Sequence, residues 1–194
     1  MSSPQLAATS QSRTVSISDN GTPVLLHYND LESYHMGDSW WGCTVGFRAM
    51  QVAANVFAQT TSWDRYCLYV VSGHPGQGVK DAIEFVTHCI SKKRFELTEE
   101  MQNLKGCSRN MQFKWWISNG STTVFIQLRD GHIPALFFDL LDRLGTEKEI
   151  DSDREEFDQL KMDLSQQGWQ LELDEMFNVR QLSKPLSIGE IPHA

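Results

Sequence analysis

The segment YCLYVVSGHPGQGVKDAIEFVTHCI, residues Tyr66–Ile90, gives the clearest indication of the fold class. It opens with the compact apolar run Tyr66–Val71, which has the length of a buried strand and places Cys67 in the core. A turn rich in glycine and proline follows at 72–78, and a helix is predicted over 79–90. The apolar residues of this helix share one face: Ala82, Ile83, Val86 and Ile90. A strand, a glycine-rich turn and a helix in this order predict an α/β domain.

Upstream of this unit, the sequence predicts a hairpin and a long buried helix. Thr14–Ile17 alternates like a short strand, Asn20-Gly21 is a turn signal, and Val24–His27 is the expected partner strand. From Gly42 to Ala58 the apolar residues follow a helical stripe: Val45, Ala49, Met50, Val52, Ala53, Val56 and Phe57. Residues 1–13 are rich in Ser, Gln and Ala and are predicted to form a disordered tail.

Downstream, two strand-like runs flank a good hairpin turn. Met111–Ile117 and Thr122–Leu128 are the strands, and Ser118-Asn119-Gly120 is the turn. The later segments are predicted to be two helices, a short helix or strand, and an extended arm: Ile133–Leu144, Asp151–Gln166, Leu171–Leu182 and Ser183–Ala194. We therefore expect one domain over 14–182, followed by an arm over 183–194.

Composition and charge narrow the class of protein. The formal net charge is −8, whereas a protein that binds nucleic acid through its phosphates carries a basic stripe. The densest basic cluster, 92–94, is flanked by glutamates and is predicted to be a solvated helix end. No run of about 18 apolar residues occurs, so we expect no membrane span. The polar N-terminal segment lacks a hydrophobic signal core, which predicts a cytoplasmic protein.

The segment YHMGDSWWGC, Tyr34–Cys43, is the first candidate site. It combines an imidazole, a carboxylate, a thiol and two indoles within ten residues. Loops that hold ligands often mix such groups, because a few polar atoms must converge inside an aromatic wall. The alternative is that Trp40 and Trp41 are core aromatics and His35 is an ordinary loop histidine. The residue types alone leave both interpretations open.

The second candidate is His74 with Asp81. His74 follows the apolar strand, a common position for site residues in α/β domains, and Asp81 is expected in the first turn of the next helix. Complementation of the helix dipole is an alternative role for this carboxylate. Cys89 and His88 form the third candidate, and a small buried thiol is the alternative role of Cys89. Two histidines with one or two thiols could also hold Zn²⁺, because this ion accepts imidazole and thiolate together.

Two motifs in this order resemble the FmdE-like family, whose members are similar to an accessory component of formylmethanofuran dehydrogenase. That family's first motif reads approximately His-Gly-His-x-Cys-Pro-Gly followed by Gly-Tyr-Arg-Ala, and here Tyr34–Gly42 runs into Gly46–Ala49. Its second motif is a Cys-x-x-Asp-Ala-Ile helix start with a downstream Gly-Cys-Thr, and here Gly78–Ile83 is followed by Thr87–Ile90. The resemblance covers roughly residues 14–180. The motif positions retained are His35, Asp81 and Cys89.

The chain departs from the family's pattern at the family's thiolate positions. Asp38 stands at the second histidine, Trp40 near the cysteine, Trp41 at the proline, and Gly78 at the cysteine that opens the second motif. The cysteines of the C-terminal zinc module that many members carry are also missing. If this loop works, the departures predict an indole-lined pocket around His35 in place of a thiolate site.

The resemblance implies an α+β fold of the FwdE/GAPDH-domain-like class. Its core has the order helix, strand, helix and three strands, with a mixed sheet and helices packed on one face. The resemblance also implies a homodimer, which can be intertwined. The family's metal chemistry implies a divalent metal, zinc, for which the candidate ligands here are His35, His74, Cys43 and Cys89.

Three functions remain open from the sequence. The first is a metal- or small-ligand-binding protein whose site lies between the loops 34–43 and 72–81, with Asp38, Trp40, Trp41 and Asp81 contacting the ligand. The second is a small enzyme acting on a planar organic molecule, such as an aromatic compound or a tetrapyrrole, with His35 or His74 as acid or base. The third is an accessory protein that binds a larger complex through the acidic helix Asp151–Gln166.

Overall fold

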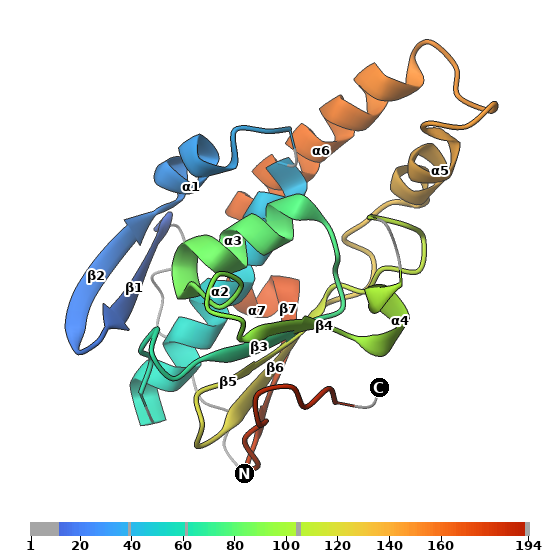
Figure 1. Ribbon diagram of the computed structural model, residues 1–194. Helices are drawn as coiled ribbons and strands as arrows, with labels where there is room; N and C mark the ends of the chain where they lie inside the picture. The colour runs from blue at the N-terminus through green and yellow to red at the C-terminus, as the bar shows by residue number, and fades with distance from the viewer. Residues whose placement is uncertain (1–11, 39, 61, 104–105, 193–194) are drawn as a thin grey trace.

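A computed structural model describes residues 12–38, 40–60, 62–103 and 106–192 (Figure 1). The predicted N-terminal hairpin is confirmed: β1 (Thr14–Asp19) and β2 (Thr22–His27) pair antiparallel, with Val15 opposite Leu26. Their turn places Asn20 and Gly21 at φ of 50° and 83°, the left-handed region that asparagine and glycine tolerate best. The predicted tail lies outside the described residues except for its last two positions.

The central sheet has five strands in the order β4-β3-β5-β6-β7. Their bounds are Phe95–Leu97 for β4, Tyr69–Ser72 for β3, Lys114–Ser118 for β5, Thr123–Leu128 for β6 and Phe177–Leu182 for β7. β3 and β4 are parallel and the other neighbours are antiparallel, so the predicted mixed sheet and α+β class are confirmed. The predicted hairpin at 118–120 joins β5 to β6.

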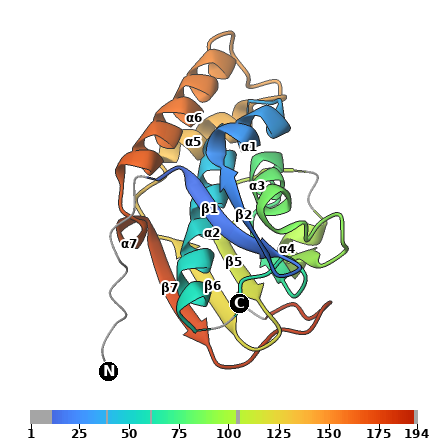
Figure 2. The same ribbon diagram turned by 90° about the vertical axis from the view of Figure 1, so that its left-hand side faces the viewer.

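The helices supply the hydrophobic layer over one face of this sheet (Figures 1 and 2). Their bounds are Tyr28–His35 for α1, Trp40–Thr60 for α2, Gln77–Thr87 for α3, Glu99–Gln102 for α4, Ala135–Arg143 for α5, Asp153–Gln170 for α6 and Leu173–Met176 for α7. The order α2, β3, α3, β4, β5 and β6 is the expected helix, strand, helix and three strands, interrupted only by α4. No helix in the described segments is long and apolar enough to cross a membrane.

Close contact between α2 and α3 sets the position of the candidate site. A Cβ atom placed at Gly46 would lie 2.8 Å from the Cβ of Ala82, and one placed at Gly42 would lie 3.3 Å from the Cα of Gly78. Glycine at these two positions of α2 therefore allows the backbones of the two helices to approach. Because α1 also packs on α3, this approach holds the middle of α3 beside the end of α1.

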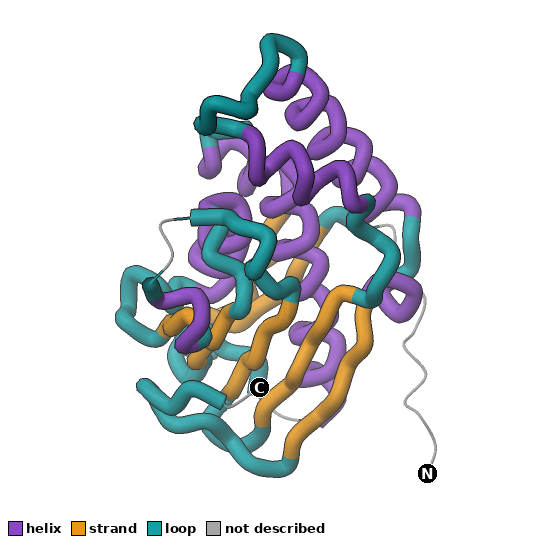
Figure 3. The backbone as a smooth tube through the Cα atoms, turned by 90° about the vertical axis from the view of Figure 1, so that its right-hand side faces the viewer, coloured by secondary structure: helices purple, strands orange, loops and turns teal. Residues whose placement is uncertain are grey.

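The opposite face of the sheet is covered by the C-terminal segment (Figure 3). Leu186 and Ile191 pack against a group of buried side chains on β3, β5 and β6: Tyr69, Val71, Trp116 and Phe125. The backbone N–H of Leu186 donates to Ser118 Oγ at 3.1 Å. The predicted arm therefore folds back and shields aromatic rings from water as far as residue 192, while 193–194 lie outside the described residues.

One prediction about the core is wrong. Cys67 is exposed, because β3 begins only at Tyr69 and the residues before it form a turn closed by the N–H of Cys67 on the carbonyl of Asp64 at 3.1 Å. Tyr66 is 78% exposed in the same turn. The apolar residues at 66–68 resemble the start of a strand, but pairing with β5 begins only at Tyr69.

Candidate functional site

The His35 imidazole and the Asp81 carboxylate form the closest contact between the two predicted loops. His35 Nδ1 lies 2.6 Å from Asp81 Oδ2, although the two residues are 46 positions apart in the chain. The side chains are only 4% and 14% exposed. A carboxylate at this distance accepts a hydrogen bond from Nδ1–H. In that tautomer the lone pair of the ring is on Nε2.

Gln77 and Gly37 complete the surroundings of the pair. Gln77 Nε2 donates to the second carboxylate oxygen of Asp81 at 2.6 Å, so both oxygens have a partner. On the other side of the ring, a Cβ atom placed at Gly37 would lie 2.7 Å from His35 Nε2. Only a glycine lets the loop 36–38 cross the imidazole this closely. Residues 36–38 of this loop are themselves exposed.

Asp81 occupies a different position from the one predicted. α3 begins at Gln77, which places Asp81 in the second turn, and the first turn carries no acidic residue. Complementation of the helix dipole falls off beyond the first turn. The contacts with His35 and Gln77 therefore account for this carboxylate better than the dipole does.

His74 has a different role, inside the loop that leads to α3. It is 3% exposed, its Nδ1 accepts the backbone N–H of Gly76 at 3.0 Å, and its ring packs edge-on against Phe113 with centroids 4.5 Å apart. Burial, and to a smaller extent the charge of Lys80, lowers the pKa of His74 to about 3. His74 is therefore a neutral imidazole that shapes the loop, and the partner expected for it, Asp81, belongs to His35.

The two indoles of the segment 34–43 separate into the two roles that the sequence left open. Trp41 is 3% exposed and packs against Phe113, so it belongs to the core. Trp40 is half-buried and lines a cleft of about 340 Å³ whose other walls include Tyr28 and Trp169. Asp38 is exposed, and its carboxylate lies 3.4 Å from Nζ of a lysine on α6.

The thiols proposed as metal ligands are buried and protonated. Burial, followed by the charges of Asp81 and Glu32, raises the pKa of Cys43 to about 12. Burial likewise raises the pKa of Cys89 to about 11, and its Sγ donates to the carbonyl of Leu68 at 3.4 Å. Within the described segments, no group of three or more His, Cys, Asp or Glu side chains could hold a metal ion. The residues present therefore do not fit the expected zinc.

Sequence reasoning missed Gln77, Gly37 and Trp169. Gln77 precedes Asp81 by four positions, the spacing at which side chains meet on a helix, so that hydrogen bond could have been found once α3 was known to begin at 77. Gly37 and Trp169 act through contacts that only the folded chain creates.

Known proteins give no further guide to this site. No protein-family model matches the chain, and no curated protein matches it.

Proposed function

We propose that this chain binds a small polar molecule at His35, and that Asp81 orients the imidazole for hydrogen bonding or proton exchange with it. The 2.6 Å contact between His35 Nδ1 and Asp81 Oδ2 carries the proposal. A buried carboxylate that accepts a hydrogen bond from Nδ1–H fixes the tautomer and the orientation of the imidazole.

Neighbouring residues fix the positions of both members of the pair. Gln77 donates a hydrogen bond to the Asp81 carboxylate, and the carboxylate orients the His35 ring. Because Gly37 has no side chain, the loop over the ring can lie close to it. A ligand that presents a hydroxyl, an acid or a ring N–H to Nε2 would meet an acceptor whose tautomer is already set. Asp81 is a positioning residue in this scheme, and His35 is the residue that touches the ligand.

A purely structural pair is the competing explanation, since the same contact ties α1 to α3. A thermal-shift screen of small polar metabolites separates the two. We expect ligands that stabilise the wild type to lose their effect in His35→Gln and to weaken in Asp81→Asn, which keeps an acceptor but removes the charge. Asp30→Asn is the matched control, because it removes an exposed carboxylate from α1, the helix that also carries His35.

The outcomes of this screen are decisive for the proposal. A ligand at 100 times its dissociation constant stabilises a protein by about 2.7 kcal/mol, which such a screen detects readily. Ligands that stabilise His35→Gln as much as the wild type would refute the role of the imidazole. Stoichiometric zinc in untagged protein, lost in His35→Gln, would replace the small-molecule proposal with a metal site.

The cleft beside Trp40 supports a second candidate, the binding of a planar organic molecule. The guanidinium of Arg13 lies 4.9 Å from the centre of the Trp169 ring. Tyr28 and Trp169 are only 1% and 8% exposed, so the half-buried Trp40 offers the most accessible ring face of the cleft. Planar ligands stack on such faces. We expect an aromatic compound or tetrapyrrole to quench tryptophan fluorescence in the wild type and in Trp41→Phe, but much less in Trp40→Ala. Equal quenching in Trp40→Ala would refute this candidate.

The resemblance in the two motifs also supports membership of the FmdE-like family and a homodimer. Light scattering on the purified chain tests the last of these. A monomer at concentrations well above cellular ones would remove the homodimer from the proposal.

A further inference from the structure

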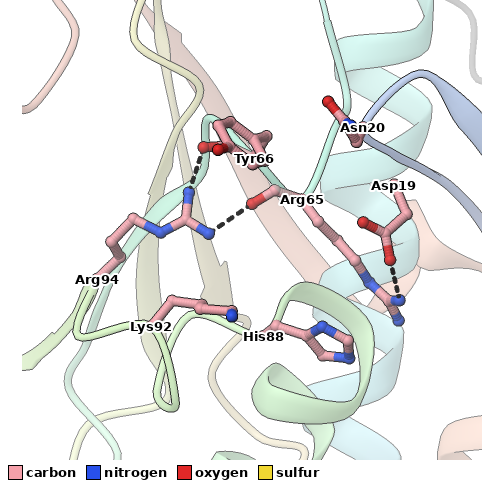
Figure 4. Close-up of a pocket in the computed structure, with 7 residues that line it drawn as sticks. All are labelled: Asp19, Asn20, Arg65, Tyr66, His88, Lys92 and Arg94. Atoms are coloured by element: carbon pink, nitrogen blue, oxygen red, sulfur yellow. Dashed lines mark hydrogen bonds and ion pairs between the residues drawn. The ribbon is translucent and has the colours of Figure 1, made fainter.

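The turn after α3 and the loop before β3 enclose a cleft of about 550 Å³ (Figure 4). The chain carries a net charge of −8, yet this cleft is lined by three cationic side chains: Arg65, Lys92 and Arg94. The ring of His88 and the exposed ring of Tyr66 also line it. The Asp19 carboxylate lines it too, so three cations and one carboxylate give the lining a net charge of +2, opposite in sign to that of the whole chain.

Arg65 has a structural role in the wall of this cleft. Its Nε donates to the carbonyl of Val86, and one of its terminal nitrogens donates to the carbonyl of Phe85, both at 2.9 Å. These bonds satisfy carbonyls at the C-terminal end of α3, where a cation is also favoured by the helix dipole. The other terminal nitrogen lies 3.0 Å from Asp19 Oδ2, so the charge of Arg65 is already balanced.

Arg94 joins the two segments that form the cleft. Its terminal nitrogens donate to the carbonyls of Tyr66 and Arg65 at 2.5 and 2.7 Å. Neutral carbonyls accept these bonds, so the positive charge of Arg94 has no carboxylate beside it among the residues described. The walls of the cleft are thus built and partly charged before any ligand enters.

Lys92, His88 and Asn20 have no comparable structural role. In the segments that the structure describes, their side chains form no hydrogen bond or ion pair. The neighbouring Asp64 carboxylate is occupied by the backbone N–H groups of Asn20, Gly21 and Tyr66 at 2.8 to 3.2 Å. Burial, followed by the charge of Arg65, lowers the pKa of His88, while the charges of Glu84 and Asp19 act in the opposite direction.

We propose that this cleft binds the phosphate group of a small molecule, with Lys92 and His88 as its direct contacts and the two arginines as its frame. A lysine ammonium is a common point-charge partner of phosphate, and an imidazole N–H can donate to the same group. The volume lies in the range of small-molecule sites and exceeds what inorganic phosphate needs. Tyr66, 78% exposed at the rim, offers a ring face to an aromatic part of the ligand.

The proposed phosphate site is independent of the His35–Asp81 pair. His88 directly follows the last residue of α3, and Asp81 lies seven residues before it. The standard rise of about 1.5 Å per residue separates the two by roughly 10 Å along the helix axis. Loss of ligand binding at His35 therefore leaves this proposal standing, and the converse also holds.

Titration of the full chain with inorganic phosphate and with phenyl phosphate, at ionic strength matched with chloride, tests the site. Nuclear magnetic resonance reports the dissociation constant and the pKa of His88 together. Lys92→Gln is the test variant and Lys93→Gln is the matched control, because both lysines are exposed, adjacent and equally charged but only the first lines the cleft.

We expect saturable binding of phosphate, a rise in the pKa of His88 on saturation, and binding at least about tenfold weaker in Lys92→Gln, as for loss of a charge-assisted hydrogen bond. Phenyl phosphate should bind more tightly than phosphate, and Tyr66→Ala should remove that difference. Absence of saturation below about 10 mM, or equal weakening in Lys93→Gln, would overturn the site. Tighter binding of inorganic phosphate than of phenyl phosphate would overturn its assignment to a phosphorylated molecule.

Discussion

Replacement of Gly46 by alanine tests the packing of α2 on α3 that positions Asp81. Two opposing terms set the expected effect. In an open helix the change stabilises by about 1 kcal/mol, because glycine loses more backbone entropy than alanine. Here the new methyl would lie 2.8 Å from Ala82 Cβ and 3.2 Å from Val79 Cα, well inside the ordinary carbon–carbon separation of about 3.5 to 4.0 Å.

Both obstructing atoms are fixed to the backbone of α3, so the helices must separate. Overpacking of this kind costs about 1 to 3 kcal/mol, and a clash with anchored atoms belongs in the upper part of that range. We therefore expect Gly46→Ala to lower the free energy of unfolding by about 1 to 2 kcal/mol after the gain in helix propensity is included. Equilibrium unfolding in urea, followed by tryptophan fluorescence, measures this change in unfolding free energy. We expect the slope of the free energy against urea concentration to stay the same.

A graded control and a double variant sharpen this test. At Gly42 the nearest atoms, Gly78 Cα and Val79 N, would be 3.3 Å away, so the two terms should nearly cancel in Gly42→Ala. Removing the Ala82 methyl as well should rescue part of the loss in Gly46→Ala, with a coupling energy of about 1 kcal/mol. Stabilisation by Gly46→Ala, or a coupling energy near zero, would show that the helices do not approach as the structure describes.

Three further predictions concern ionisable side chains. Because the pKa of His74 falls from 6.5 to about 3 on folding, its contribution to stability is complete above pH 6.5 and is lost as the pH falls towards 3. His74→Asn should flatten the fall in unfolding free energy across this window by up to about 1.4 kcal/mol per pH unit, and an unchanged slope would contradict the assigned pKa. Arg143 makes two hydrogen bonds to Asp153 and holds the pKa of that carboxyl below 3.8. The stabilisation is therefore present above pH 3.8 and lost below it, so in urea unfolding Arg143→Gln should weaken the acid dependence only in that lower range. In native protein the exposed thiol of Cys67 should react first with Ellman's reagent, and Cys43, with a pKa raised to about 12 by burial, only after denaturation.

Much of the fold could be predicted because its signals are local. The alternation of Thr14–Ile17, the helical stripe of 42–58 and the hairpin turn at 118–120 each depend on neighbours in the chain, and each appears in the structure near its predicted place. The strand β4 was missed because three residues cannot display a period. Cys67 was placed in the core because an apolar run does not show where a turn ends.

The candidate site could be predicted less completely, because its contacts join residues that are far apart in the chain. Residue types identified His35 and Asp81 as separate candidates, but nothing in either segment indicated that they are partners. Likewise, the residue types of Trp40 and Trp41 are identical, and only the packing of α2 makes one a core residue and the other a cleft wall.

Local sequence signals are enough to predict the class of the domain, the approximate extent of its main helices and strands, and the segments 34–43 and 72–81 as candidate sites. Apolar periodicity and turn residues act over a few positions, so they can be read along the chain. Only the tertiary structure decided that His35 faces Asp81 while His74 is buried and neutral. It also decided that Lys92 and Arg94 border a cleft. The partner of a side chain depends on which elements pack together, and the close approach of α2 and α3 requires the absence of a methyl group at Gly46.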